Sequence, residues 1–156
     1  MQTALKWREE LVQAVVAGEE KPEAALEHLE ARRGASGLPL GPEADMGFAA
    51  MDLGHRFLAH RRPAEAEIFF RAAEQALARA VAITSDTEAR EKAQYLQKLA
   101  LIRGNYLNQA GQARQDIEAA IKLQPEDEYL ARVKSALARR HPAGFRAEVK
   151  PEGDRP

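Results

Sequence analysis

The stretch that decides the fold runs from Ala50 to Ala73 and reads AMDLGHRFLAHRRPAEAEIFFRAA. Its apolar residues recur every three to four positions on both sides of a short polar turn, Arg61-Arg62-Pro63. This pattern predicts two helices joined as a hairpin, and proline at 63 suits the first turn of the second helix. Two small residues, Gly54 and Ala66, stand where the helices would cross, so we expect the hairpin to pack closely.

The composition of the whole chain favours a single all-α domain. It has 156 residues, of which 45% are hydrophobic and 30% charged, and this length is sufficient to bury a core. Strong helix formers dominate, whereas β-branched and aromatic residues are sparse. The net charge of −1 provides no overall field that would attract nucleic acid or an anionic membrane.

Localisation is predicted from what the sequence lacks. It contains no cysteine, which excludes disulfide bonds and a cysteine nucleophile and fits a reducing compartment. The longest apolar runs are only a few residues, so we expect no membrane-spanning segment. Charged residues between Lys6 and Glu10 interrupt any signal-peptide core. We therefore expect a cytoplasmic protein.

Caps, glycines and prolines predict seven helices. Thr3 is expected to cap the first and Gly18 to stop it, while Ser85 with Glu88 forms the capping-box pattern before the fifth. The predicted ranges are 4–17, 22–34, 43–60, 63–83 and 86–110, followed by a sixth helix after Gly111 and a seventh opened by Pro125 that ends at 141.

Two segments are predicted to be irregular. Glycines and prolines crowd the segment 34–42, which we expect to form a loop pinned to the body by Leu38 and Leu40. The segment 142–156 holds three prolines and scattered charges and is expected to be a disordered tail.

The fifth predicted helix is apolar on two sides, which indicates that it packs between neighbours. The two sets are Ala89, Ala93, Leu96, Ala100 and Leu107 on one side and Tyr95, Leu99, Ile102 and Tyr106 on the other.

The decisive stretch resembles the tetratricopeptide repeat. The family pattern, a small or aromatic residue followed by x2-Leu-Gly-x2-Tyr and then Ala-x3-Phe, is matched here by Ala50, Leu53, Gly54 and Phe57, then Ala66, Phe70 and Ala73. The family's closing proline is replaced by Ala78.

A second, damaged copy of the pattern follows. Ala100-x2-Arg103-Gly104-x2-Leu107 resembles the first helix of the repeat, with Arg103 where leucine is usual, and 120–125 resembles its closing segment. The glycines of the two copies are about 50 residues apart, against a family period of about 34, so both central helices are expected to be longer than in the family.

The resemblance implies one tetratricopeptide-like domain over residues 1–141, an all-α stack of antiparallel helix-turn-helix repeats that coils into a short superhelix. Its predicted parts are a helix pair at 4–34, a repeat at 43–84, a degenerate repeat at 86–124 and a capping helix at 125–141. In this family the first helix of each pair lines a concave surface that binds a peptide or a helix of another protein.

Carrying these concave positions over gives a set of candidate binding residues. Asn105 falls where some family members use asparagine to hold a peptide backbone or a terminal carboxylate. The companion lysine is missing because Met51 and Leu101 occupy its places, which argues against a clamp for a chaperone tail. The implied set is Phe48, Met51, His55 and Ala59 from the first repeat, and Lys98, Leu101, Asn105, Asn108 and Gln109 from the second.

The residues themselves leave a simpler interpretation open, in which Phe48 and Met51 belong to the core beneath the N-terminal helices. His55 is expected to be solvated or hydrogen-bonded rather than catalytic. The four histidines lack metal-ligand spacing, and the sequence has no phosphate loop or nucleophile motif. We therefore expect no catalytic residues, no metal, no cofactor and no enzyme activity.

The functional hypothesis is a non-catalytic interaction module or adaptor that binds another protein or a peptide through the concave surface, with no nucleic acid or membrane partner. Two alternatives remain open: a homo-oligomer assembled through the ends of the stack, and a small secretion chaperone of the tetratricopeptide type. The last helix is locally basic through Arg132, Lys134, Arg139 and Arg140, which suits a helix C-terminus better than contact with nucleic acid.

Overall fold

The computed structural model describes residues 2–33 and 41–146, and within them the fold is all-α, with seven helices and no strand. The short 3-10 helix η1 (Asp86–Glu88) precedes α5. The seven are α1 (Gln2–Val16), α2 (Pro22–Ala31), α3 (Pro42–Ala59), α4 (Pro63–Ile83), α5 (Ala89–Asn105), α6 (Ala110–Leu123) and α7 (Glu128–Arg140).

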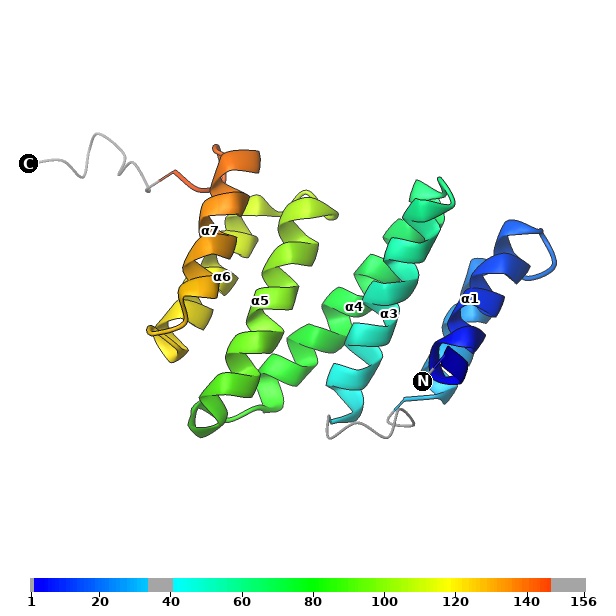
Figure 1. Cartoon of the computed structure of the whole chain (residues 1–156), viewed down its shortest axis with the longest axis horizontal. Coiled ribbons are helices and arrows are strands. Elements are labelled where there is room, and N and C mark those ends of the chain that lie inside the picture. Colours follow the sequence, from blue (N-terminus) through cyan, green and yellow to red (C-terminus); the bar gives the residue numbers. More distant parts are fainter. Residues whose placement is uncertain (1, 34–40, 147–156) are drawn as a thin grey trace, which may run out of the picture.

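The helices follow one another along the long axis of the molecule, with the N-terminal pair at one end and α7 at the other (Figure 1). The most extensive packing joins α3 with α4 and α5 with α6. Helix α4 also packs on α5, and α7 lies on α6 and α5. The α1–α2 pair contacts both α3 and α4. The chain is therefore a row of helical layers in which each layer buries its face against the next.

The hairpin predicted from the decisive stretch is confirmed. The end of α3 is closed by a hydrogen bond from Arg61 N to Leu58 O and another from Arg62 N to Phe57 O, both 2.9 Å long. Arg61 has a φ of 58°, the left-handed conformation that usually closes such a helix end. Pro63 then opens α4 without losing a hydrogen bond.

The close approach of α3 and α4 depends on two glycines. A Cβ placed on Gly54 would lie 2.7 to 2.9 Å from three ring carbons of Phe70, and one on Gly47 would lie 2.6 Å from Cγ of Leu77. Only hydrogen fits at these two points of α3. The prediction that a small residue at position 54 permits the crossing is confirmed, and Gly47 extends the close contact by about two turns.

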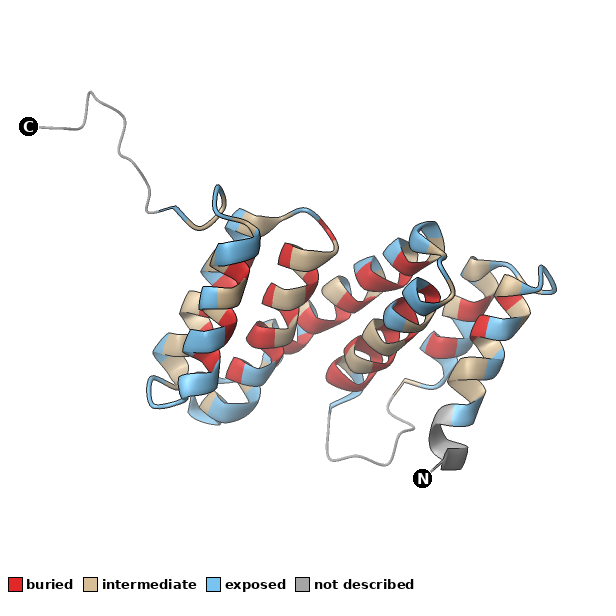
Figure 2. Cartoon of the chain, turned by 45° about the horizontal axis from the view of Figure 1, so that its top comes forward, coloured by how far each residue is buried: buried red, intermediate tan, exposed pale blue. Residues whose placement is uncertain are grey.

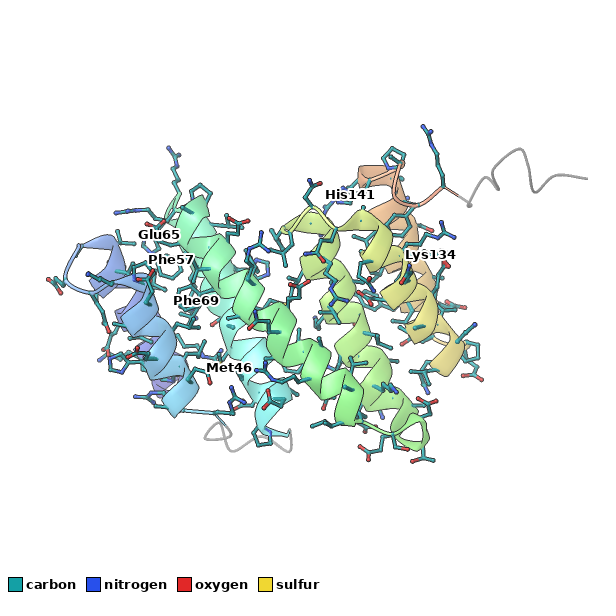
Figure 3. All side chains as sticks on the ribbon, turned by 180° about the vertical axis from the view of Figure 1, so that it is seen from behind. Met46, Phe57, Glu65, Phe69, Lys134 and His141 are labelled. Atoms are coloured by element: carbon teal, nitrogen blue, oxygen red, sulfur yellow. The ribbon has the colours of Figure 1, made fainter. Side chains whose placement is uncertain are left out.

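The apolar interior is divided into two clusters. The first lies between α1–α2, α3–α4 and one side of α5, and it includes the stacked rings of Phe57 and Phe69, whose centroids are 5.1 Å apart. Met46, Phe57 and Phe69 lie on the side of α3 and α4 that faces the N-terminal pair (Figure 3). The second cluster lies between the other side of α5, α6 and α7. Buried residues are concentrated in the middle of the stack, whereas the turns at helix ends are exposed (Figure 2).

The two-sided character predicted for α5 is confirmed, because this helix supplies residues to both clusters. Leu99 and Ile102 belong to the first cluster and Leu96 and Ala100 to the second. Leu107 is a correction: it belongs to the first cluster, because the chain leaves the helix before reaching it.

At the N-terminal end, one predicted helix boundary is confirmed and another is wrong. Gly18 ends α1 with a φ of 77°, as its position indicated. Thr3 is not the cap, since α1 already begins at Gln2. Helix α2 ends at Ala31. The predicted stop at residue 34 and the pinned leucines of the loop lie outside the described residues.

The range 86–110 predicted for the fifth helix is too long at both ends. Ser85 accepts a hydrogen bond from Thr87 N at 3.2 Å and so caps η1 rather than α5, which begins at Ala89. At the other end α5 stops at Asn105, because Asn108 adopts a left-handed φ of 55° and the chain reverses there. Gly111 consequently lies inside α6.

The seventh helix begins later than predicted. Pro125 lies in the preceding turn, and the Asp127 side chain caps α7 by accepting a hydrogen bond from Tyr129 N at 3.0 Å. Residues 142–146 continue as turns, and Phe145 packs against the second cluster. The prediction of disorder is therefore wrong for 142–146; the remainder of that segment lies outside the described residues. No helix among the described residues is long and apolar enough to cross a membrane.

Candidate functional site

The structure brings one part of the predicted binding set together on the α3–α5 surface, which we define by Phe48, Met51 and His55 of α3 with Lys98 of α5 and Tyr106 directly after it. Four of these residues are half-buried and one, His55, is exposed. They share a face because the α3 members are three and four positions apart along a helix. The surface offers aromatic, thioether and cationic groups at the boundary between the core and solvent.

Aromatic contacts fix both ends of this surface. The rings of Phe48 and Tyr95 lie with centroids 6.1 Å apart. At the other end Tyr106 stacks on Phe70 with centroids 4.1 Å apart and an interplanar angle of 2°. The ring of His55 stands edge-on to both, 5.2 Å from Tyr106 and 5.3 Å from Phe70. Rings held in this way have few alternative rotamers, so the surface is preorganised.

His55 is polarised by its neighbours. The Tyr106 hydroxyl lies 3.4 Å from its Nδ1. Partial burial of the ring lowers the pKa of His55; Asp52 opposes this shift and Lys98 adds to it. The imidazole is therefore neutral near pH 7 and can both donate and accept a hydrogen bond.

The N-terminal helices contact a different side of α3. Arg8 binds Asp52 at 3.2 Å, and Glu9 binds both Arg56 at 2.8 Å and His60 at 3.0 Å. This ionic chain runs along the edge of α3 that faces α1. The N-terminal pair therefore contacts α3 through these ion pairs as well as through the first cluster.

The simpler interpretation of Phe48 and Met51 holds in part. Both side chains pack against the first cluster, and both remain half-buried rather than fully enclosed. The aromatic partner of Phe48 comes from α5 and not from α1 or α2. Ala59 is exposed one turn beyond His55, at the end of α3.

The second half of the predicted set is not part of this surface. Leu101 packs against the second cluster. The Oδ1 of Asn105 lies 3.1 Å from Nε2 of His141, so its amide is engaged by the residue that follows α7 of its own chain. Asn108 and Gln109 occupy the turn between α5 and α6, where Asn108 is exposed.

Arg103, which departs from the family pattern, forms a largely buried ionic network. Its guanidinium lies 2.9 Å from a carboxylate oxygen of Glu74 on α4 and 2.9 Å from one of Asp116 on α6. The side chain of Asp116 is only 7% exposed. Burial raises the pKa of Asp116, and the hydrogen bond from Arg103 opposes the rise. Through these ion pairs Arg103 of α5 joins α4 and α6, whereas a leucine at this position would contribute only apolar packing.

Sequence reasoning assigned Tyr95 and Tyr106 to packing positions of α5 and missed their place beside the α3–α5 surface. A usable signal was present, since both tyrosines occur on one of the two apolar sides predicted for this helix, opposite Ala93 and Ala100; the pattern did not specify which neighbours that side contacts. What the pattern did not contain was the ring stacking between Tyr106 and Phe70, which joins residues 36 positions apart in the sequence.

The surface carries aromatic, thioether, imidazole and ammonium groups. The hydroxyl that contacts His55 belongs to a tyrosine, which does not form a nucleophile–base pair of the acyl-transfer type with it. Within the described part of the chain, no group of three or more His, Cys, Asp or Glu side chains could hold a metal ion.

Compared with known proteins, the chain matches no family model, no curated protein and no solved structure. The resemblance to tetratricopeptide repeats therefore depends on the residues of the chain and on the arrangement of its helices.

Proposed function

We propose that this protein is a non-catalytic, tetratricopeptide-like interaction module that binds a peptide or helix of another protein on the α3–α5 surface. The observation that carries the proposal is the set of aromatic and thioether side chains that the fold fixes in place without enclosing: Phe48, Met51, His55 and Tyr106. Aromatic residues and methionine are enriched at protein interfaces, where their large contact area costs little conformational entropy.

The helix arrangement supports the same proposal. Two consecutive antiparallel pairs, α3–α4 and α5–α6, pack side by side. Gly54 of α3 lies against Phe70 of α4, and Gly104 of α5 lies against Ala113 of α6 and Leu137 of α7. A stack of this type exposes the first helices of successive pairs on one side, which creates an extended surface. The cytosol is the compartment we propose, because the sequence contains no cysteine that an oxidising compartment could use.

Site-specific photo-crosslinking in the native lysate tests the proposal. A photoreactive amino acid placed at Met51 is expected to crosslink a partner protein, whereas the same amino acid at exposed Gln115 of α6 is the matched control and is expected to crosslink none of it. Combining Lys98→Glu with the photoreactive amino acid at position 51 is expected to reduce the crosslink. Equal crosslinking from positions 51 and 115 would show that the α3–α5 surface is not the binding site.

A further inference from the structure

The charges that border the α3–α5 surface differ in sign between its two ends. Helices α3, α5 and α7 lie toward the viewer in Figure 1, and α4 and α6 lie in front in the opposite view of Figure 3. Side chains of α5 and of the end of α7 therefore stand beside the aromatic residues of the surface. Their charges determine which partner groups each end of the surface favours.

The end of the surface beside Phe48 and Tyr95 is acidic. Glu91 is exposed one turn before Tyr95 on the same side of α5, and exposed Glu88 directly precedes the helix. Burial raises the pKa of the Tyr95 hydroxyl, and the charges of Glu91 and Glu88 raise it further. Within the described part of the chain neither glutamate has an ion-pair partner, so both can pair with a cation of a bound segment.

The end of the surface beside Tyr106 is basic. Nε2 of His141 lies 3.1 Å from Oδ1 of Asn105, and this contact holds the end of α7 against the end of α5. Arg140 directly precedes His141, is exposed and has no ion-pair partner among the described residues. Burial raises the pKa of Tyr106, and the positive charge of Arg140 opposes that rise. The guanidinium therefore acts on the same end of the surface as the Tyr106 hydroxyl.

Lys98 adds a second cation to this half of the surface. It lies two turns after Glu91 on the same side of α5, about 10 Å along the helix axis. Burial lowers the pKa of His55, and the charge of Lys98 adds to this shift, which indicates that its ammonium group is close to the imidazole. Among the described residues Lys98 has no ion-pair partner. Along α5 the charges of the surface therefore change from negative to positive.

Asp52 of α3 does not cancel this basic half. Its carboxylate is already bound by Arg8 at 3.2 Å and by Arg56 at 2.9 Å. The cations of Lys98 and Arg140 therefore remain available. Acidic residues at the start of a helix suit the helix dipole, but Lys98 lies in the middle of α5, where the dipole gives no reason for a cation.

We propose that the α3–α5 surface binds an apolar partner segment with an acidic group at one end and a basic group at the other, and that it holds the acidic end beside Tyr106 and the basic end beside Tyr95. This inference rests on the proposed function and extends it to the chemistry and the direction of the partner. From Glu91 to Asn105 the surface follows α5 for about 21 Å, which matches about four turns of a bound helix.

The charges select both the type of partner and its direction. A partner with charges of one sign would meet a like charge at one end of the surface, which disfavours binding. A segment with opposite charges at its two ends avoids this conflict, but only in one direction. Apolar contacts with Phe48 and Met51 are not directional, so they would hold the segment equally well in either direction.

Paramagnetic NMR with a synthetic peptide measures the direction of binding. The probe is a helical peptide of about 16 residues with leucines along one face, glutamates in its first turn and lysines in its last turn. A nitroxide at the acidic end is expected to broaden the amide signals of Asn105 and Tyr106 more than those of Glu91 and Tyr95. A nitroxide at the basic end is expected to give the opposite pattern.

Reversing the charges of the surface tests whether they set this direction. The reversed chain carries Glu88→Lys, Glu91→Lys, Lys98→Glu and Arg140→Glu, and it is expected to exchange the two broadening patterns. The milder variant Lys98→Gln with Arg140→Gln is expected to weaken binding of the peptide about tenfold, because two exposed charge pairs are lost. In about 500 mM salt the preference for one direction is expected to decline, because the charges are screened.

The matched control exchanges an exposed pair away from the surface. Glu67→Lys with Arg71→Glu swaps a 2.9 Å ion pair on α4 and is expected to leave the broadening pattern and the affinity unchanged. Circular dichroism verifies that every variant is folded.

Several results would overturn the proposal. They are the absence of peptide binding, equal broadening at both ends, and the same pattern in the wild-type and reversed chains. If the same amide signals shift with concentration in the chain alone, the surface binds a second copy instead, which also overturns the proposal. The proposed function fails on a different result, namely equal photo-crosslinking from positions 51 and 115, so the two failures can be distinguished.

Discussion

Replacing Gly54 by alanine tests the packing on which the whole fold depends. Alanine in a helix is favoured over glycine by about 1 kcal/mol, so a helix with free space at this position would gain stability. Here the new methyl group would lie 2.7 to 2.9 Å from three carbons of the Phe70 ring. That ring is 1% exposed and is stacked on Tyr106, so it has little freedom to retreat.

The magnitude follows from these two opposing terms. Overpacking a well-filled core costs about 1–3 kcal/mol, and the immobile ring places Gly54→Ala near the upper end of that range. After the gain in helix propensity, the net loss in the free energy of unfolding is about 1–2 kcal/mol. For a chain of this size the loss corresponds to a decrease in Tm of about 3–6 °C.

Urea denaturation compared between two alanine variants provides the measurement. Gly111→Ala in α6 is the matched control, because no atom lies within 4 Å of its Cβ position. It is expected to be neutral or stabilising by up to about 1 kcal/mol. The double variant Gly54→Ala with Phe70→Leu is expected to cost less than the sum of its parts. If Gly54→Ala proves as stable as Gly111→Ala, the close helix crossing is not what requires glycine.

Three further predictions concern the polar contacts. Arg103→Ala leaves buried Asp116 without its cation. The free energy of unfolding measured in urea is expected to fall by about 3 kcal/mol, and a loss below about 1 kcal/mol would refute a structural role for Arg103. The hydrogen bond from His60 lowers the pKa of Glu9 below its ordinary 4.5. The ionised carboxylate therefore stabilises the fold above pH 4.5, and this stabilisation is lost as the pH falls. In the Glu9→Gln variant the urea midpoint is expected to decline less steeply in acid than in the wild type. The NMR titration midpoint of His55 is expected below 6.5, and Tyr106→Ala, which exposes the ring, should raise it.

The helices could be predicted because their causes are local. Apolar spacing, Gly18 and Pro63 are sufficient to define helix existence and several ends, and they did so for α4 at both boundaries. The predicted first residues of α5 and α7 were wrong because the residues expected to begin each helix lie in a turn before it. Ser85 caps a 3-10 turn instead of the long helix, and Asp127 rather than Pro125 begins α7. Such choices depend on hydrogen bonds to neighbouring backbone groups that no residue spacing specifies.

The candidate surface was predictable only in part. The resemblance to the tetratricopeptide repeat placed Phe48, Met51 and His55 together on the first helix of the repeat, and the structure keeps them on one face of α3. The α5 residues could not be assigned in the same way. The angle at which α5 packs on its neighbours decides which face of α5 remains open, and the sequence does not specify that angle. Asn105 therefore turned out to contact His141 at the end of α7, while Tyr106 completed the aromatic end of the surface.

By itself, the sequence determined that the chain is helical, that a hairpin over residues 50–73 crosses closely at Gly54 and that α5 has two buried sides. These properties follow from the helical period and from the size of single residues. Only the tertiary structure decided that Arg103 joins Glu74 and Asp116. Contacts between helices far apart in the chain depend on their relative orientation, which arises when all of the layers pack together.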